Sequence, residues 1–234
     1  MNDSQPRQTL QVGLTQAHQC NYLSNQQERL AVVMDHQWHS QSGYEILLTS
    51  GFRRSGETIY IPKCEHCTAC QSLRVDCLNF SPSKSQKRLS KQIQHFTFVL
   101  KNTLDSNWFE LYENYISTRH RSGSMYPANK EQFLTFTDNQ WLTPKYLHIY
   151  EHNKLIAIAI TDVVDNAMSA LYTFFDTTNP LSMGTAAILL QIKIAQQLDI
   201  RWLYLGFQID ECAAMSYKVR YKPNQKLVNG EWLG

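Results

Sequence analysis

Three apolar segments in the second half of the chain, separated by short polar turns, constrain the fold most. The segments are KYLHIY (145–150), KLIAIAITDVV (154–164) and AMSALYTFF (167–175). Apolar runs joined by such short polar stretches predict antiparallel strands connected by tight hairpins. The stretch 183–198 is rich in Ala, Ile, Leu and Gln and predicts a long helix introduced by Ser182. We therefore expect a three-stranded meander followed by a helix.

The neighbouring segments extend this pattern on both sides. Helices are predicted at 105–119 and 130–136, and a buried strand at 202–206 follows the long helix. This is the element order of GNAT-type acyltransferases, although many α+β proteins share such orders. We predict an α+β protein with a C-terminal GNAT-like acyltransferase domain at 96–234. A smaller cysteine-containing N-terminal domain with a basic segment is predicted at 1–95.

Shorter elements are expected in the N-terminal half. The apolar spacing at 26–34 suggests one or two helical turns, whereas 44–48 suggests a strand. Further strands are predicted at 58–61, 73–80 and 96–100, and a basic helix at 81–92. A short helix is expected at 212–217, and the segment 221–233 is expected to form a turn and a final strand.

Charge and cysteine content narrow the classes of function. The formal net charge is only +2, so any contact with nucleic acid must come from a local basic patch. The first residues lack the pattern of a secretory signal, and the apolar runs are too short to span a bilayer. The six cysteines are then expected to be reduced thiols or metal ligands, and the protein is expected to be cytoplasmic.

The stretch PKCEHCTACQSLRV places three cysteines, Cys64, Cys67 and Cys70, at even spacing. The spacing matches part of an iron–sulfur run, but the nearby fourth ligand of that run is missing. Cys77 lies in a predicted strand, where a thiol more often packs than binds. Three interpretations stay open at this point: an iron–sulfur cluster, a tetrathiolate zinc site, or free thiols without metal.

Two groups of basic residues are candidates for binding phosphates. On a helix, Lys84, Lys87, Arg88 and Lys91 fall on one face, which would form a phosphate-contacting stripe. The alternative is an ordinary solvated helix face. In YKVRYK (217–222), Lys218, Arg220 and Lys222 alternate with aromatic residues that could stack on unpaired bases or pack in the core.

Several longer motifs occur in order along nearly the whole chain. They are CNYLSNQQERL (20–30), GFRRSG (51–56), YIPKCEHCTACQSLRV (60–75), FSPSKSQKR (80–88), LYTFFD (171–176), SMGTAAILLQI (182–192), YLGFQIDECAAMSYKVRYKP (204–223) and Trp232. Together they make the chain resemble the arginyl-tRNA–protein transferase family, in particular its shorter bacterial leucyl branch. The chain departs from that pattern at Phe175, Thr177 and Ser24, where the family more often has Tyr, Pro and Pro.

This resemblance implies a reaction, a co-substrate and a set of partners. Leucine would pass from Leu-tRNA to the N-terminal amine of proteins that begin with Asp or Glu, which marks them for degradation. The donor ester is already activated, so the transfer step needs no cofactor. The resemblance also brings Cys20 close to Cys64, Cys67 and Cys70 as the fourth ligand of an iron–sulfur cluster or zinc site. It favours an RNA-binding role for the basic residues. No membrane partner is expected, because the apolar runs are too short to span a bilayer.

The chemistry of this reaction selects candidate site residues. A carboxylate at the acceptor N-terminus calls for a guanidinium, and Arg53, Arg54 and Arg74 are the preferred candidates, with Lys218 and Arg220 also considered. The acceptor amine calls for a hydrogen-bond acceptor or base, for which we select three residues: Asp176, Tyr172 and Glu211. Asp176 could equally be the turn residue before the long helix.

Three rival functions differ in donor or class. The donor could be arginyl-tRNA, although few acidic residues near the C-terminal motifs favour leucine. A GNAT acetyltransferase using acetyl-CoA is disfavoured because SMGT contains one glycine where a pyrophosphate loop has several. A metal-knuckle RNA binder would leave the long apolar C-terminal half without a purpose.

Overall fold

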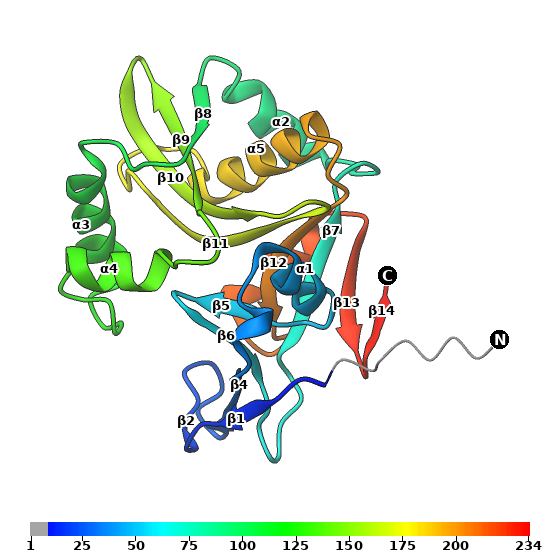
Figure 1. Ribbon diagram of the computed structural model, residues 1–234. Helices are drawn as coiled ribbons and strands as arrows, with labels where there is room; N and C mark the ends of the chain where they lie inside the picture. The colour runs from blue at the N-terminus through cyan, green and yellow to red at the C-terminus, as the bar shows by residue number, and fades with distance from the viewer. Residues whose placement is uncertain (1–8) are drawn as a thin grey trace.

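The computed structural model describes residues 9–234 and is organised around an eight-stranded sheet (Figure 1). Its strand order is β14-β13-β7-β12-β11-β10-β9-β8, and all neighbours are antiparallel except β11 and β12. The strands are β7 (Gln71–Asp76), β8 (Thr97–Lys101), β9 (Lys145–Glu151), β10 (Lys154–Val163), β11 (Ala167–Phe175), β12 (Trp202–Gln208), β13 (Asn224–Val228) and β14 (Glu231–Leu233). The predicted meander is confirmed as β9, β10 and β11.

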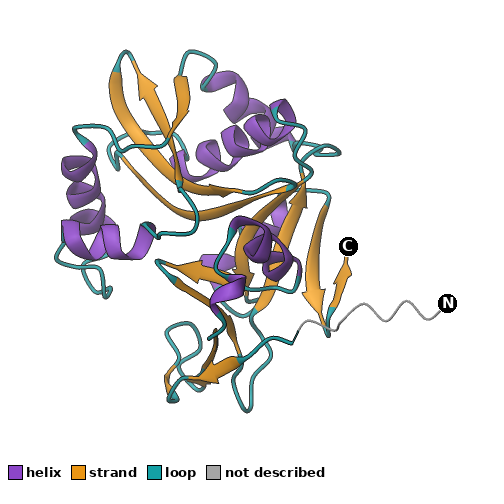
Figure 2. Cartoon of the chain, viewed as in Figure 1, coloured by secondary structure: helices purple, strands orange, loops and turns teal. Residues whose placement is uncertain are grey.

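Helices cover both faces of this sheet, as Figure 2 shows. Alternate residues of β10 face opposite sides: Ala157 and Ala159 pack with the buried face of α5, whereas Ile158 and Ile160 pack against α3 and α4. The helices are α2 (Lys84–Gln92), α3 (Trp108–Arg119), α4 (Lys130–Thr137) and α5 (Met183–Gln197), all close to their predicted ranges. None of the helices in residues 9–234 is long and apolar enough to cross a membrane.

A second, smaller sheet carries the motif GFRRSG. Its strand order is β1-β4-β6-β5, formed by β1 (Val12–Leu14), β4 (Leu30–Val33), β5 (Arg53–Ser55) and β6 (Thr58–Pro62). Shorter elements complete the chain: a two-stranded sheet of β2 (His18–Gln19) and β3 (Gln27–Glu28), helix α1 (Gln41–Thr49), and the 3-10 helices η1 (His36–Trp38), η2 (Ala213–Met215) and η3 (Lys218–Arg220).

Two of the predicted N-terminal elements are wrong. The expected helical turns at 26–34 are the strands β3 and β4, whose residues pair with β2, β1 and β6. The expected strand at 44–48 is part of α1, because Ser40 caps this helix by accepting a hydrogen bond from the backbone N–H of Gly43. In both cases the apolar segment is too short to distinguish the 3.6-residue period of a helix from the two-residue period of a strand.

The large sheet takes strands from both sides of the predicted domain boundary. β7 belongs to the first 95 residues, yet it lies between β12 and β13 inside the sheet. The two predicted domains therefore share one sheet, and the boundary at 95 and 96 stays a prediction.

The strands β11 and β12 separate soon after they pair. Their parallel pairing covers only Ala167–Ser169 and Trp202–Tyr204, although β11 continues to Phe175 and β12 to Gln208. β12 pairs irregularly with β7 between Tyr204 and Gly206, and Gly206 has a φ of +82° that favours glycine. The point of separation leaves backbone carbonyls without a strand partner, and side chains from other elements reach it.

Candidate active site

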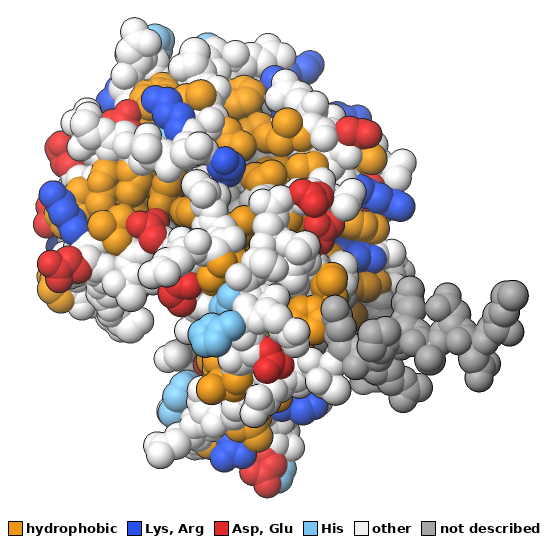
Figure 3. Space-filling view, viewed as in Figure 1, with side chains coloured by type: hydrophobic (Ala, Val, Ile, Leu, Met, Phe, Trp, Pro, Cys, Tyr) orange, Lys and Arg blue, Asp and Glu red, His pale blue; other side chains and the backbone are white. Residues whose placement is uncertain are grey.

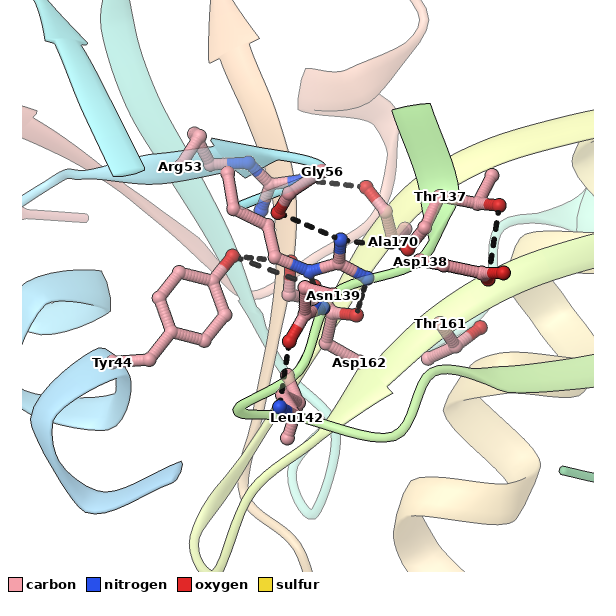
Figure 4. Close-up of polar contacts among 12 residues, drawn as sticks. Tyr44, Arg53, Gly56, Thr137, Asp138, Asn139, Leu142, Thr161, Asp162 and Ala170 are labelled. Atoms are coloured by element: carbon pink, nitrogen blue, oxygen red, sulfur yellow. Dashed lines mark hydrogen bonds and ion pairs between the residues drawn. The ribbon is translucent and has the colours of Figure 1, made fainter. Parts of the chain in front are cut away.

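Arg53 reaches the point where β11 and β12 separate. Its Nη2 donates a hydrogen bond to the carbonyl of Ala170 at 2.6 Å (Figure 4). Its Nη1 donates to the carbonyl of Tyr204 at 3.4 Å. The side chain comes from β5 in the small sheet, and the residue is only 6% exposed. Arg53 therefore joins the two sheets and replaces the missing strand partner, while part of its guanidinium remains available.

Lys218 approaches the same point from η3. It is 7% exposed, and its Nζ donates a hydrogen bond to the carbonyl of Phe207. A Cβ placed on Gly206 would lie 3.8 Å from Lys218 Nζ and also 3.8 Å from Nε and Nη2 of Arg53. Burial, followed by the charge of Arg53, lowers the pKa of Lys218 to about 8. We call these two cations the Arg53–Lys218 pair.

The Arg53–Lys218 pair has no carboxylate partner within the described residues. The ion pairs at 4.0 Å or less in 9–234 involve other side chains, and neither Arg53 nor Lys218 takes part in one. Burying two like charges without a counter-charge is costly. An anionic ligand between them would offset this cost, so the pair has the character of an anion-binding site.

Arg54, the next residue, has a different environment. Its Nε and Nη2 donate to the two carboxylate oxygens of Asp162 at 2.9 and 2.5 Å, and both side chains are fully buried. Its Nη1 donates to the carbonyl of Thr137 at 2.8 Å, and Figure 4 shows Tyr44 facing Asp162. The sequence-based assignment of Arg54 to the substrate carboxylate does not fit this geometry, because Asp162 already occupies the guanidinium.

The side chain of Arg74 also binds other side chains of this protein. Its guanidinium lies between the rings of Trp202 and Trp232, at 3.8 and 4.1 Å from their centroids. Its Nε and Nη2 both donate to Oε1 of Gln225, at 2.9 and 2.7 Å. The structure thus places Arg74 in an aromatic stack, and of the three predicted arginines Arg53 is the one that remains suited to an acidic ligand.

The three residues predicted to serve the acceptor amine lie in different surroundings. Asp176 accepts hydrogen bonds from Lys154 Nζ at 2.8 Å and from Thr178, and these bonds lower its pKa to about 2. A carboxylate this acidic is a poor base, and its contacts are those of a turn residue. Tyr172 packs on Phe136 and Tyr115, and burial raises its pKa. Glu211 is exposed and lines another cavity.

A groove of about 410 Å³ lies between α2 and the start of α5. Its lining comes from four segments: α2 with its cap (Ser83, Ser85, Gln86, Arg88, Leu89, Gln92), the loop before α5 (Pro180, Leu181), the first turn of α5 (Ser182, Thr185) and the C-terminal motif (Tyr217, Arg220, Tyr221). Tyr217, in this lining, directly precedes Lys218 in the sequence. One residue that lines the groove is therefore the sequence neighbour of Lys218 in the Arg53–Lys218 pair.

The predicted basic stripe occupies the exposed face of α2. Ser83 caps this helix, its residues Gln86 and Leu89 are buried, and the four basic residues point outward: Lys84, Lys87, Arg88 and Lys91. Arg220 and Lys222 are exposed as well, whereas Lys218 is buried and does not belong to an exposed basic strip. Figure 3 shows acidic and basic side chains interspersed on one face of the molecule, so phosphate binding must be local.

The four predicted metal ligands line one small cavity. Cys20, Cys64, Cys67 and Cys70 surround about 60 Å³ together with side chains that include Tyr60 and Phe207. Burial, followed by the nearby thiols of Cys64, Cys20 and Cys67, raises the pKa of Cys70 to about 12. Within residues 9–234, however, no group of three or more His, Cys, Asp or Glu side chains is arranged to hold a metal ion. The residue types fit a thiolate site, but their present arrangement does not.

Comparison with known proteins decides the family. Residues 18–88 match the model for the arginine-tRNA-protein transferase N terminus, and residues 107–228 match the model for its C terminus. This chain belongs to the arginine-tRNA-protein transferase family. The two matched regions each supply one member of the Arg53–Lys218 pair and one wall of the groove, so the site requires both regions of the family fold.

Relatives within this family are similar over nearly their full length. The chain is 52% identical to the aspartate/glutamate leucyltransferase of Vibrio cholerae serotype O1 over 228 residues, which are 97% of this chain and 98% of that protein. The enzyme of the same name from Vibrio vulnificus (strain CMCP6) is 49% identical, over 96% of this chain and 97% of that protein. Among solved structures, L-PGS from Bacillus licheniformis matches with a TM-score of 0.48 and 10% identity, over 72% of this chain and 49% of that chain.

Sequence reasoning missed the partnership between Arg53 and Lys218 in this transferase. Lys218 is a candidate for a carboxylate from its charge alone, but the alternating YKVRYK motif is typical of an exposed basic strip and favours tRNA. One available signal was Gly206, since a glycine inside a strand often marks a place where other groups approach the backbone closely. The burial of Lys218 depends on β12 and η3 meeting, which no local pattern shows.

Proposed function

We propose that this chain transfers leucine from Leu-tRNA to the N-terminal amine of proteins beginning with Asp or Glu, which marks them for degradation. The observation that carries this proposal is the 52% identity, over nearly the whole of both chains, to a protein named aspartate/glutamate leucyltransferase. The buried Arg53–Lys218 pair supports it, because an acidic acceptor needs a cationic site. The reaction belongs in the cytoplasm, where aminoacyl-tRNA is available.

The chemistry is aminolysis of an activated ester. The acceptor α-amine has an ordinary pKa of about 8, so a useful fraction is neutral at cellular pH. Catalysis can then depend on holding the amine and ester together and on stabilising the tetrahedral oxyanion. This requirement agrees with two adjoining binding regions, a groove for the donor and a cationic site for the acceptor.

The donor tRNA would lie along α2 and enter the groove beside α5. The exposed cations Lys84, Lys87, Arg88, Lys91, Arg220 and Lys222 would contact phosphates, and Tyr217 at the end of the groove would stack on the unpaired acceptor end. The acceptor carboxylate would bind Arg53. Tyr172 and Glu211 stay predictions for the acceptor amine, whereas the contacts of Asp176 favour its role as a turn residue.

The fold assignment at finer detail is also part of this proposal. We infer a GNAT-like arrangement for the C-terminal region from the β9–β11 meander, the following α5, and the parallel strands β11 and β12 that separate. The short parallel pairing of β11 and β12, which ends where Arg53 binds the carbonyls of Ala170 and Tyr204, supports the inference.

The assay that tests the function offers labelled donors to defined acceptors. Purified protein is mixed with radiolabelled Leu-tRNA, Arg-tRNA or acetyl-CoA and with peptides beginning with Asp, Glu, Lys or Ala. Leucine incorporation restricted to the Asp and Glu peptides is the expected result. Label passing from acetyl-CoA alone would replace this function by acetylation, and label from Arg-tRNA would change the donor.

A metal at the cysteine cavity is a separate proposal. Cys20, Cys64, Cys67 and Cys70 would hold an iron–sulfur cluster or zinc through thiolates only after their side chains turn toward one centre, because they are not arranged around one ion here. The bound group would then brace the N-terminal region beside Tyr60 and Phe207. Iron and zinc analysis with an absorption spectrum of anaerobically purified protein tests it. Preparations without stoichiometric iron or zinc would remove the metal from this account.

A further inference from the structure

We propose that Lys218 determines acceptor specificity by binding, together with Arg53, the side-chain carboxylate of an N-terminal Asp or Glu. This inference rests on the proposed leucine transfer and assigns a specificity residue to it. It moves Lys218 from the tRNA-binding set to the acceptor site. The reasons are the position, the hydrogen-bonding capacity and the uncompensated charge of the two side chains.

The position is defined by Gly206. Nε and Nη2 of Arg53 and Nζ of Lys218 all lie 3.8 Å from the point that a Cβ on Gly206 would occupy. Because glycine has no Cβ, this point is not filled by the residue itself. Both cationic groups thus border the same small volume, at the place where β11 and β12 separate.

The two side chains retain hydrogen-bond donors for a ligand. An ammonium has three N–H donors and a guanidinium has five. The carbonyl of Phe207 accepts from Lys218, and the carbonyls of Ala170 and Tyr204 accept from Arg53. Donors therefore remain on both groups, and the two oxygens of one carboxylate could accept from a lysine and an arginine at once.

The charge of the pair favours an anion over a neutral ligand. Both residues are less than a tenth exposed, and in the part of the chain that the structure describes neither has a carboxylate within 4.0 Å. A carboxylate bound between them would relieve their mutual repulsion. An amide of the same shape, as in Asn or Gln, would not do so, and this difference is the basis of specificity.

The neighbours of Lys218 place the acceptor beside the donor. Tyr217, the preceding residue, lines the groove proposed for the tRNA end. The side-chain carboxylate of Asp or Glu is only a few covalent bonds from its own α-amine. A carboxylate held by Lys218 would therefore keep the attacking amine close to the end of the groove where the leucyl ester is expected.

The test compares variants of Lys218 on acidic and amide peptides. Initial rates are measured with Leu-tRNA and four peptides that differ only in the first residue: Asp, Glu, Asn or Gln. Lys218→Met is expected to lower kcat/KM for the Asp and Glu peptides by about 10- to 100-fold, mainly through KM. The rates with Asn and Gln peptides should change by less than about threefold, and Lys218→Arg should restore preference for the acidic peptides.

Matched controls separate this role from a structural one. Lys193→Met removes an exposed lysine on α5 and should leave the preference as in the wild type. Thermal melting checks folding, and Lys218→Gln, which retains a donor for the Phe207 carbonyl, replaces the Met variant should the latter not fold. Calorimetry without the tRNA should show that the wild-type protein binds the Asp peptide more tightly than the Asn peptide, and that the neutral variant loses this difference.

The outcomes distinguish the inference from the function on which it rests. A wild-type protein that transfers no leucine to any peptide contradicts the proposed function. A wild-type protein that does transfer leucine, combined with a folded neutral variant that keeps the full preference for Asp over Asn, overturns the role of Lys218. An equal loss on all four peptides through kcat would also overturn it.

Discussion

Two adjacent arginines occupy opposite kinds of environment in this protein. Arg54 is fully buried and shares two hydrogen bonds with the carboxylate of Asp162, whereas Arg53 is nearly buried and faces a second cation, Lys218. Successive side chains of a strand point to opposite faces of the sheet, so Arg53 and Arg54 of β5 lie on opposite faces. A buried cation with its own carboxylate supports the fold, and a buried cation without one can bind a ligand.

The largest expected effect is the loss of stability on breaking the Arg54–Asp162 ion pair. Asp162→Asn would leave Arg54 buried without its counter-charge, and we expect it to lower the free energy of unfolding by about 3–5 kcal/mol. Urea unfolding followed by fluorescence measures the loss. The control Asp199→Asn removes an exposed carboxylate and should change stability by less than about 0.5 kcal/mol. A loss from Asp162→Asn as small as that of the control would contradict a structural role for the Arg54–Asp162 pair.

Removing Arg53, the arginine without a carboxylate partner among the described residues, should affect activity more than stability. Arg53→Met is expected to reduce kcat/KM with Asp peptides by about 100-fold, and to cost about 1–2 kcal/mol because the carbonyls of Ala170 and Tyr204 lose a donor. Leucine transfer and urea unfolding measure the two effects. Arg121→Met, at an exposed arginine, is the control and should match the wild type in both. An Arg53→Met protein with normal transfer would remove Arg53 from the site.

The pH dependence of stability offers a subtler contrast. The pKa of Lys218 is about 8 in the folded protein, below its ordinary value, because of burial and then the charge of Arg53, with Cys212 and Cys70 acting in the opposite direction. Between about pH 8 and 10 the unfolded chain then binds more protons, so stability should rise with pH. We expect Lys218→Met to lack about 1–2 kcal/mol of this rise.

The measurement for this contrast is the free energy of unfolding at pH 7, 8, 9 and 10. Lys193→Met, with its exposed lysine, should follow the wild type across this range. If the free energy of unfolding changes equally between pH 8 and 10 in the wild type and in Lys218→Met, the pKa of Lys218 is not lowered in the folded protein. That result would contradict the burial of Lys218 beside Arg53 without a counter-charge in the described part of the chain.

The exposed cations of α2 should show the smallest effect. Lys87→Gln combined with Arg88→Gln should raise KM for Leu-tRNA about tenfold. The slope of the logarithm of the binding constant against the logarithm of salt concentration should become smaller by about two, because two phosphate contacts are lost. Stability should not change, because both side chains are exposed. A double variant of equal charge, Lys101→Gln with Lys193→Gln, removes exposed lysines away from the groove. Equal effects from the two double variants would argue against a specific tRNA path along α2.

Local sequence patterns predicted the parts of this fold that depend on near neighbours. The meander, α5 and the basic helix α2 each carry their own period, turn or cap within a few residues. The strand predicted at 44–48 was wrong because the cap at Ser40 outweighed a short apolar run.

The roles of Arg53 and Arg54 could not be separated in the same way. They belong to one motif, GFRRSG, and differ only through residues more than a hundred positions away, Asp162 for one and Lys218 for the other. The burial of Lys218 depends likewise on the packing of η3 on β12. The resemblance to the transferase family predicted which residues would matter, but only the tertiary structure divides them between fold and site.

The most direct test of this account is a crystal structure of the protein bound to a peptide that begins with Asp, without tRNA so that no transfer occurs. The account predicts the Asp side-chain carboxylate within about 3 Å of both Arg53 and Lys218, above Gly206. A carboxylate bound at Arg74 or on α2, with neither Arg53 nor Lys218 in contact, would contradict it.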